Sequence, residues 1–457
     1  MIAELLNSNT TVTYGSTIEA VAYGLVDGGV SVVTGYPGFH AQEIINGVGG
    51  TISVNERTAY SIAWGAALAG TRSAVALKNV GLNDAADPLV NSMNLRTNAG
   101  MVVIVLDDVE VAGSQCRQDS RHYFDLAPGI WLEPMSAAHA YDCVRNAAQW
   151  SEELESPVVI RLTNESLRST EKFVRCNSEV LITQFRRDPV SSVAHPVNVA
   201  AQRFENEKRS RRISCFVERQ FAFEFGGAHG SVAIGAAMPP SKRACCHVWT
   251  YPLPGVSLRQ QLRHAKSIDV HEAGTHFASE KIRALLSAIP VETRDRSAQC
   301  DHSESYRTTD QFDPLFAAIR TIRNRIVVGD LGSFTMDSHR TIDACLCYGA
   351  SVATAIGCNL GKLGYKTICV TGDAAFLHSG KAALEEAAYR ETDITLVLID
   401  NGGAVSTGGQ SVPSMIRFPG AASVTEVRHQ STSESSYYML LHGLVDLPGI
   451  NVLHIRV

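Results

Sequence analysis

The stretch from Lys366 to Gln410 constrains the fold of this 457-residue chain more than any other. The β-rich run Lys366–Val370 leads to a Thr-Gly-Asp turn, a helical pattern covers Ala382–Arg390, and the apolar run Ile394–Ile399 leads to Asp-Asn-Gly-Gly. A β-α-β unit of this length closes right-handed, so its two strands should be parallel and adjacent, or nearly so. The sequence therefore predicts a parallel sheet in this part of the chain.

Polar side chains follow both strands of this unit. Asp373 and Asn401 stand at the two carboxyl ends, which face the crevice where open α/β sheets bind ligands. A carboxylate, an amide oxygen and a backbone loosened by Gly402 and Gly403 suit a hard cation such as Mg²⁺ that holds a phosphate. Polar residues also end many β-α-β units without binding anything, so these residues alone leave both interpretations open.

Strands alternate with helices over about the first 165 residues as well. A capping box at Ser16–Glu19 opens a helix, and further helices are expected at residues 41–48, 58–69 and 137–155. We expect the glycine-containing stretch Lys78–Asp87 to be a polar loop. The strand candidates are residues 31–34, 51–54, 73–77, 101–106 and 157–162. This alternation predicts an α/β fold with a doubly wound parallel sheet.

Glu56 lies just beyond one of these strands, before a helix of small residues that can pack closely. From its position alone, a solvated helix-start carboxylate stabilised by the helix dipole is the commoner case. A glutamic acid shielded from water would instead have a raised pKa and could share a proton with a bound ring nitrogen.

Eight segments together resemble one known family. VTGYPGFHAQEI, SVNERTAYSIAWGAALAG, ALKNVGLNDAADPL and GSQCRQDSRHYF are similar to the pyrimidine-binding domain of the indolepyruvate ferredoxin oxidoreductase α subunit. GDLGSFTMD, DACLCYGAS, GDAAFLHSG and DNGGAVSTGGQ resemble its diphosphate-binding domain, in the same order. The resemblance covers most of residues 15–165 and 325–410. In the thiamine-diphosphate signature, Ala374 replaces a glycine and Asp400 replaces an asparagine.

The resemblance implies a thiamine-diphosphate-binding fold with two doubly wound parallel-sheet cofactor domains and a smaller α/β middle domain. The expected boundaries are residues 1–165 for the pyrimidine domain, 166–295 for the middle domain with a linker, and 296–457 for the diphosphate and Mg²⁺ domain. It also implies that each active site lies between two subunits, with the glutamate from one and the diphosphate site from the other, so a homodimer or homotetramer is expected.

The same resemblance implies roles for individual residues. Asp373, the side chain of Asn401 and the carbonyl of Gly403 would ligate Mg²⁺, and Glu56 would hydrogen-bond the aminopyrimidine ring of thiamine diphosphate. His378 and His40, each close in sequence to an expected cofactor contact, are candidates for proton transfer. The expected cofactor contacts are Tyr36, Pro37, Gly38, Asp330, Gly332, Ser333, Tyr348, Gly349, Gly372, Asp373, Ala374, Ala375 and Asn401.

The cysteines decide which reaction is expected. The family continues into a cysteine-rich ferredoxin module, whereas the 11 cysteines of this sequence are scattered and none follows Cys369. We therefore expect a non-oxidative decarboxylase of a 2-oxo acid, aromatic by family analogy, that works through ylid and enamine intermediates. The alternatives are a carboligase, an oxidoreductase catalytic subunit served by a separate iron–sulfur partner, and a non-catalytic cofactor-binding scaffold.

Bulk properties limit the partners. The formal net charge of −6 gives no electrostatic case for nucleic acid or a membrane surface. The first 15 residues lack the pattern of a signal peptide, and no apolar run is long enough to span a bilayer. We expect a cytoplasmic protein with a small-molecule substrate and no nucleic-acid or membrane partner.

Overall fold

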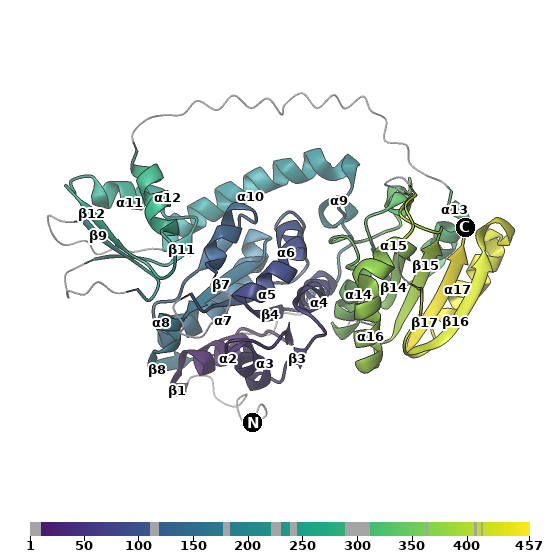
Figure 1. Ribbon diagram of the computed structural model, residues 1–457, viewed down its shortest axis with the longest axis horizontal. Coiled ribbons are helices and arrows are strands. Elements are labelled where there is room, and N and C mark those ends of the chain that lie inside the picture. The colour runs from purple at the N-terminus through teal and green to yellow at the C-terminus, as the bar shows by residue number, and fades with distance from the viewer. Residues whose placement is uncertain are drawn as a thin grey trace.

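The computed structural model describes most of the chain. The described residues are 11–109, 118–176, 183–220, 230–237, 245–287, 311–361, 364–405, 409–412 and 415–457. Figure 1 shows a large α/β unit at the centre, a small one at the left, and a third, coloured green to yellow, at the right. Within the described residues, no helix combines the length and the apolar character that crossing a membrane requires.

The central unit is built on a sheet of seven strands in the order β11-β6-β7-β5-β4-β2-β3. Its neighbouring strands are parallel except β11, which pairs antiparallel with β6. The middle strands are buried apolar runs, as expected for a sheet covered on both faces. The strands are β2 (Val32–Gly35), β3 (Thr51–Ile52), β4 (Ser73–Lys78), β5 (Met101–Asp107), β6 (Ile130–Leu132), β7 (Val158–Thr163) and β11 (Thr250–Tyr251). The sequence-based prediction of a parallel α/β sheet is confirmed here.

Helices accompany this sheet, and a two-stranded antiparallel ribbon of β1 (Thr11–Ser16) and β8 (Thr170–Arg175) adjoins it. The predicted capping box at Ser16 and Glu19 forms and opens α2. The predicted loop at residues 78–87 is wrong, because α5 and α6 occupy most of it. The helices are α2 (Thr17–Asp27), α3 (Ala41–Gly47), α4 (Glu56–Ala69), α5 (Asn79–Asp84), α6 (Ala86–Ser92), α7 (Ala137–Leu154), α8 (Asn164–Leu167), α9 (Pro189–Ser192) and α10 (Val199–Gln220).

The small unit contains the parallel strands β10 (Cys246–Val248), β9 (Gly230–Ile234) and β12 (Ile268–His271), with α11 (Gly255–Leu262) and α12 (Phe277–Leu286). A buried ionic network joins it to the central unit. Arg121, from the central unit, pairs with Glu272 at 2.7 Å and donates to the carbonyl of Ala273 at 2.7 Å. Removing one partner of such a buried pair would leave a charge uncompensated, so the network fixes the small unit in place.

The third unit is a fully parallel sheet in the order β13-β14-β15-β17-β16. Its elements are α13 (Asp313–Thr321), β13 (Arg325–Gly329), η4 (Ser333–Met336), α14 (Ser351–Leu360), β14 (Lys366–Gly372), α15 (Asp373–Ala375), η5 (Phe376–Gly380), α16 (Lys381–Tyr389), β15 (Ile394–Asp400), β16 (Ala421–Arg428), α17 (Glu434–Leu444) and β17 (Ile450–Arg456). β14 and β15 are adjacent and parallel, as the β-α-β argument predicts.

Helices α4 and α14 bind the central and third units to one another (Figure 1). Glycines make this contact close: a Cβ on Gly357 would lie 2.0 Å from the carbonyl oxygen of Ile62, and one on Gly65 would lie 2.1 Å from that of Thr354. Ile62 itself belongs to the apolar core of the third unit. The first residue of α4 is Glu56, so this helix carries the predicted catalytic carboxylate to the boundary between the two sheets.

Candidate functional site

A cavity of about 490 Å³ lies at the carboxyl ends of β14 and β15, beside the segment that follows β13. This is where a parallel α/β sheet is expected to bind a ligand. Its lining residues are Leu331, Gly332, Phe334, Tyr348, Gly372, Asp373, Ala374, Ala375, Ile399, Asn401, Gly403, Ala404 and Val405. Eight of the residues predicted from the sequence for cofactor or metal binding therefore come together in one cavity.

Three oxygen-bearing groups meet at the edge of this cavity. One terminal atom of the Asn401 amide lies 3.2 Å from Asp373 Oδ1 and 2.8 Å from the carbonyl oxygen of Gly403. With its nitrogen there, Asn401 donates to both acceptors. With its oxygen there, three oxygens converge, which is the ligand set that a hard cation requires. The residues present therefore fit a divalent cation of the Mg²⁺ type.

The environment of Asp373 agrees with a cation-binding role. Burial raises the pKa of its carboxyl above the ordinary value, and the nearby charge of Asp400 raises it further, while the backbone N–H of Ala374 opposes the rise. A cation would compensate the buried charge. Among the described residues, no three His, Cys, Asp or Glu side chains gather as a metal site. The predicted set differs because it uses one carboxylate, one amide and one carbonyl.

Tyr348 and His378 stand side by side at the cavity. The two rings lie 5.2 Å apart in an edge-on arrangement, and Tyr348 lines the cavity. His378 Nδ1 is 2.9 Å from the Ser379 hydroxyl, which donates to the carbonyl of Gly349 at 3.2 Å. A side chain at Gly349, whose φ is 77°, would collide with that hydroxyl. The π-helical turn η5 that carries His378 is a feature often found at functional sites.

Asp330 lies beneath the cavity and does not line it. Its fully buried carboxylate accepts from the backbone N–H of Ser351 at 3.0 Å, the Ser351 hydroxyl at 2.6 Å and the Thr371 hydroxyl at 2.5 Å. It thereby ties β13, β14 and the start of α14 together. Its predicted contact with the cofactor stays a prediction, and the side chain of Ser333 lies outside the described part of the structure.

Glu56 begins α4, with Asn55 as the N-cap whose side chain accepts from the backbone N–H of Thr58 at 2.8 Å. Its side chain packs on Gly81 of α5, where a Cβ would lie only 2.5 Å from Glu56 Oε1. Burial raises the pKa of the Glu56 carboxyl, and the charge of Asp84 adds to the rise. A raised pKa is what a carboxyl needs if it is to hold a proton near neutral pH.

Glu56 is not among the residues that line the cavity. Two contacts that the sequence did not reveal join its neighbours Val54 and Arg57 to the unit that contains the cavity. Arg57 Nη2 donates to the carbonyl of Tyr348 at 2.7 Å, and Glu386 of α16 accepts from the backbone N–H of Val54 at 3.0 Å. Helical spacing offers a signal for Glu386, because it shares the buried face of α16 with Ala383 and Ala387.

The predicted turn at Tyr36–Gly38 follows β2, and Gly38 lies against Lys78, which pairs with Asp108 at 2.8 Å. His40 adopts a left-handed backbone conformation and places Nδ1 2.9 Å from Glu43 Oε1 on its own helix. None of these residues lines the cavity described above. Their roles stay predictions.

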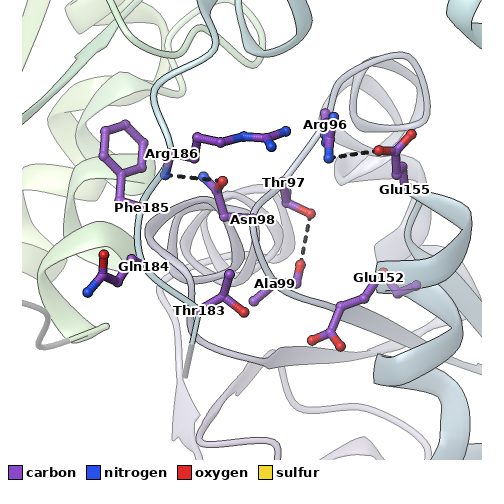
Figure 2. A pocket seen from close by; sticks show the side chains of 11 residues that line it. Arg96, Thr97, Asn98, Ala99, Glu152, Glu155, Thr183, Gln184, Phe185 and Arg186 are labelled. Carbon is purple, nitrogen blue, oxygen red and sulfur yellow. Dashed lines mark hydrogen bonds and ion pairs between the residues drawn. The ribbon is translucent and has the colours of Figure 1, made fainter. Parts of the chain in front are cut away.

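A second cavity, of about 440 Å³, lies between the turn before β5, the end of α7 and residues 183–186 (Figure 2). Its carboxylates are already paired: Glu155 with Arg96 at 2.8 Å, and Glu152 with Arg72 at 2.7 Å. It includes none of the residues predicted for catalysis or cofactor binding. The chemistry is therefore assigned to the first cavity.

Comparisons with known proteins support this location. Residues 330–440 match the family described as thiamine pyrophosphate enzyme, C-terminal TPP binding domain. The indolepyruvate oxidoreductase subunit IorA of Archaeoglobus fulgidus is 24% identical over 86% of this chain and 75% of its own length. IorA of Methanothermobacter thermautotrophicus is 25% identical over 87% of this chain and 76% of its own length.

Two solved structures share the fold. A putative thiamin diphosphate-dependent enzyme from Mycobacterium smegmatis aligns with a TM-score of 0.53 at 14% identity over 96% of this chain and 99% of its own. A thiamine diphosphate-dependent 4-hydroxybenzoylformate decarboxylase from Rhodococcus jostii aligns with a TM-score of 0.53 and is 16% identical in sequence. The alignment covers 97% of this chain and 99% of the decarboxylase. The chain thus has the fold of thiamine-diphosphate-dependent enzymes, carries their C-terminal TPP-binding domain, and is a distant relative of the IorA subunits.

Proposed function

We propose that this chain is a thiamine-diphosphate- and Mg²⁺-dependent enzyme that decarboxylates a 2-oxo acid without net oxidation. The observation that carries the proposal is the convergence of Asp373, Asn401 and Gly403 at a cavity lined by Tyr348, whose carbonyl accepts from Arg57, the residue after Glu56. Asp373, Asn401 and the Gly403 carbonyl would hold the cation and through it the diphosphate. When bound, thiamine diphosphate supplies a carbon nucleophile and an electron sink for the carbonyl carbon of the substrate.

The residues of this chain supply proton transfer around that carbon. Burial raises the pKa of the Glu56 carboxyl, and this residue would be the one to share a proton with the aminopyrimidine ring of a bound cofactor. His378 Nδ1 is held by Ser379, so Nε2 is the nitrogen that we assign to proton delivery. In the balanced reaction, the bond between the carboxylate and the carbonyl carbon breaks, carbon dioxide leaves, and the carbonyl carbon gains one proton to give an aldehyde.

The cysteines support the choice of a non-oxidative reaction. The four thiols nearest the site in sequence, Cys345, Cys347, Cys358 and Cys369, are buried, and burial raises the pKa of each. Thiolates are the ligands of iron–sulfur clusters, and among the described residues no three His, Cys, Asp or Glu side chains gather as a metal site. Decarboxylation to an aldehyde requires no electron acceptor.

The relatives favour a second candidate. Both IorA proteins carry the name of an oxidoreductase subunit and match over most of this chain. In that case the chain would pass two electrons to the clusters of a separate protein. A carboligase, which joins the same carbon to a second carbonyl, and a non-catalytic cofactor-binding scaffold are the remaining alternatives.

One screen separates these functions. The protein is loaded with thiamine diphosphate and Mg²⁺ and offered aliphatic and aromatic 2-oxo acids, with and without an aldehyde and a ferredoxin. Carbon dioxide and an aldehyde without ferredoxin are expected, and Asp373→Ala should abolish both. A carbon–carbon-bonded product, or turnover only with ferredoxin, would replace the proposal by the corresponding alternative. Tight cofactor binding without exchange of the thiamine C2 proton would indicate the scaffold.

A further inference from the structure

Hydrogen bonds on both sides of Glu56 connect this part of the chain to the unit that contains Asp373. On one side, the backbone N–H of Val54 donates to Glu386 Oε2 at 3.0 Å. On the other, Arg57 Nη2 donates to the carbonyl of Tyr348 at 2.7 Å and pairs with Asp87 at 2.5 Å. The two contacts flank the residue whose position determines proton transfer.

Glu386 is fixed firmly enough to act as a positioning group. It is 2% exposed, and its other oxygen accepts from Arg390 Nε at 2.7 Å. Arg390 Nη2 also donates to the hydroxyl of Ser53 at 3.3 Å, directly before Val54. A buried carboxylate that is paired and hydrogen-bonded on both oxygens has little freedom to move.

Glu386 also belongs to the same rigid piece of chain as the cation site. α15, η5 and α16 form one unbroken helical run from Asp373 to Tyr389. A displacement of this run would therefore move Asp373 and Glu386 together, and Glu386 would carry the Ser53–Val54 backbone with it. Glu386 in this way connects the cation site to the backbone ahead of Glu56, in addition to the α4–α14 contact that joins the two units.

We propose that Glu386 is a positioning residue that, together with Arg390, assembles the two halves of the thiamine site within one chain by holding the backbone ahead of Glu56. This inference rests on the function proposed above. Because a misplacement of a catalytic group by about 1 Å can cost on the order of a hundredfold in rate, loss of the hold should slow proton transfer at the cofactor. Loss of the Glu386 contact should leave the cation site of Asp373, Asn401 and Gly403 in place.

The test uses a double variant, because Glu386→Leu alone leaves Arg390 buried without its partner and can prevent folding. Glu386→Leu combined with Arg390→Leu removes both the ion pair between the two residues and the hydrogen bond from the Val54 N–H to Glu386. The matched control is Glu385→Gln, which changes the neighbouring, exposed glutamate of the same helix. Glu386→Gln keeps one oxygen acceptor for Val54 and should give an intermediate result.

Three quantities are measured: amide hydrogen exchange of residues 50–58 in the cofactor-free protein, Mg²⁺-dependent thiamine diphosphate affinity, and exchange of the thiamine C2 proton in the loaded protein. The double variant should lose protection at the Val54 amide and about tenfold or more in C2 exchange, with affinity changed less than about threefold. Unchanged Val54 protection, or affinity and C2 exchange falling by the same factor, would overturn the assignment. Absence of C2 exchange in the unmodified protein would instead refute the proposed function, and the amide result would still decide the positioning role.

Discussion

Gly357 gives the sharpest test of how α4 and α14 pack. An added Cβ would lie 2.0 Å from the carbonyl oxygen of Ile62 and 2.8 Å from the backbone nitrogen of Ala66. An ordinary carbon–oxygen contact is about 3.3 Å or longer, so Gly357→Ala must part the two helices by more than 1 Å. Neither obstructing atom belongs to a side chain that could rotate away.

The magnitude follows from two opposing effects. Overpacking of this kind costs about 1–3 kcal/mol, whereas alanine in a helix is favoured over glycine by about 0.5–1 kcal/mol. Because the added carbon would overlap backbone atoms that cannot rotate away, the upper end of the overpacking cost applies, and the net loss should be about 2–2.5 kcal/mol in the free energy of unfolding. Gly443→Ala in α17 is the matched control, because a Cβ there meets nothing within 4 Å and only the favourable effect applies.

Urea denaturation followed by tryptophan fluorescence measures this difference, since Trp64 is fully buried in α4 next to Gly65. Gly357→Ala should lower the unfolding midpoint, and Gly443→Ala should leave it unchanged or raise it. Glu56 lies six residues, about 9 Å, before Ile62 along the same helix, so C2 proton exchange should fall as well. Equal midpoints for Gly357→Ala and the unmodified protein, with normal C2 exchange, would refute the close α4–α14 packing.

Three further experiments address Glu56 and the assembly of the site. Gly81→Ala would place a methyl group against the Glu56 carboxyl. Exchange of the thiamine C2 proton should therefore fall at least about tenfold, while Mg²⁺-dependent cofactor affinity is retained. Equal losses in C2 exchange and in affinity would contradict this reasoning. Because burial raises the pKa of folded Glu56, the folded state binds more protons above the ordinary glutamate pKa and loses stability as pH rises through the shifted range. Glu56→Gln should remove this loss and gain stability relative to the unmodified protein as pH rises, as measured by urea midpoints across a pH series. Because the contacts at Val54 and Arg57 lie within one chain, mixed oligomers of inactive Glu56→Gln and Asp373→Ala chains should stay inactive; recovered activity would place each site between two chains.

The positions of Asp373 and Asn401 were predictable from sequence because strand order and right-handed closure fix where carboxyl ends lie. The expected loop at residues 78–87 failed for a tertiary reason. Gly81 suggests a break in helix, yet the glycine is required there because Glu56 occupies the space of a Cβ. The segment of residues 343–350 ahead of α14 is not helical. Asp343 instead bonds to β13 through the Val327 N–H, and Gly349 takes a left-handed conformation.

The contacts that join the neighbours of Glu56 to the unit with the cavity could not be predicted from sequence, for a different reason. Val54 and Glu386 are 332 residues apart, and nothing in the local pattern of either segment specifies the other. Periodicity can show that Glu386 lies on a buried face, but only the packing of α16 against the Ser53–Val54 backbone shows what the carboxylate binds. Buried polar groups of this kind need the whole fold before their partners can be named.

The same contacts imply that domain packing and cofactor binding depend on one another. The cation site moves with α16, the proton-holding carboxyl moves with α4, and α4 is fixed to α14 by backbone-to-backbone contact. A cofactor that contacts both halves binds the packed arrangement more tightly than a separated one, so its binding free energy also stabilises the α4–α14 contact. The oxygens of Asp373, Asn401 and Gly403 all lie on one side of this contact. A change that separates α4 from α14 should therefore lower the affinity for the whole cofactor more than the affinity for the cation alone.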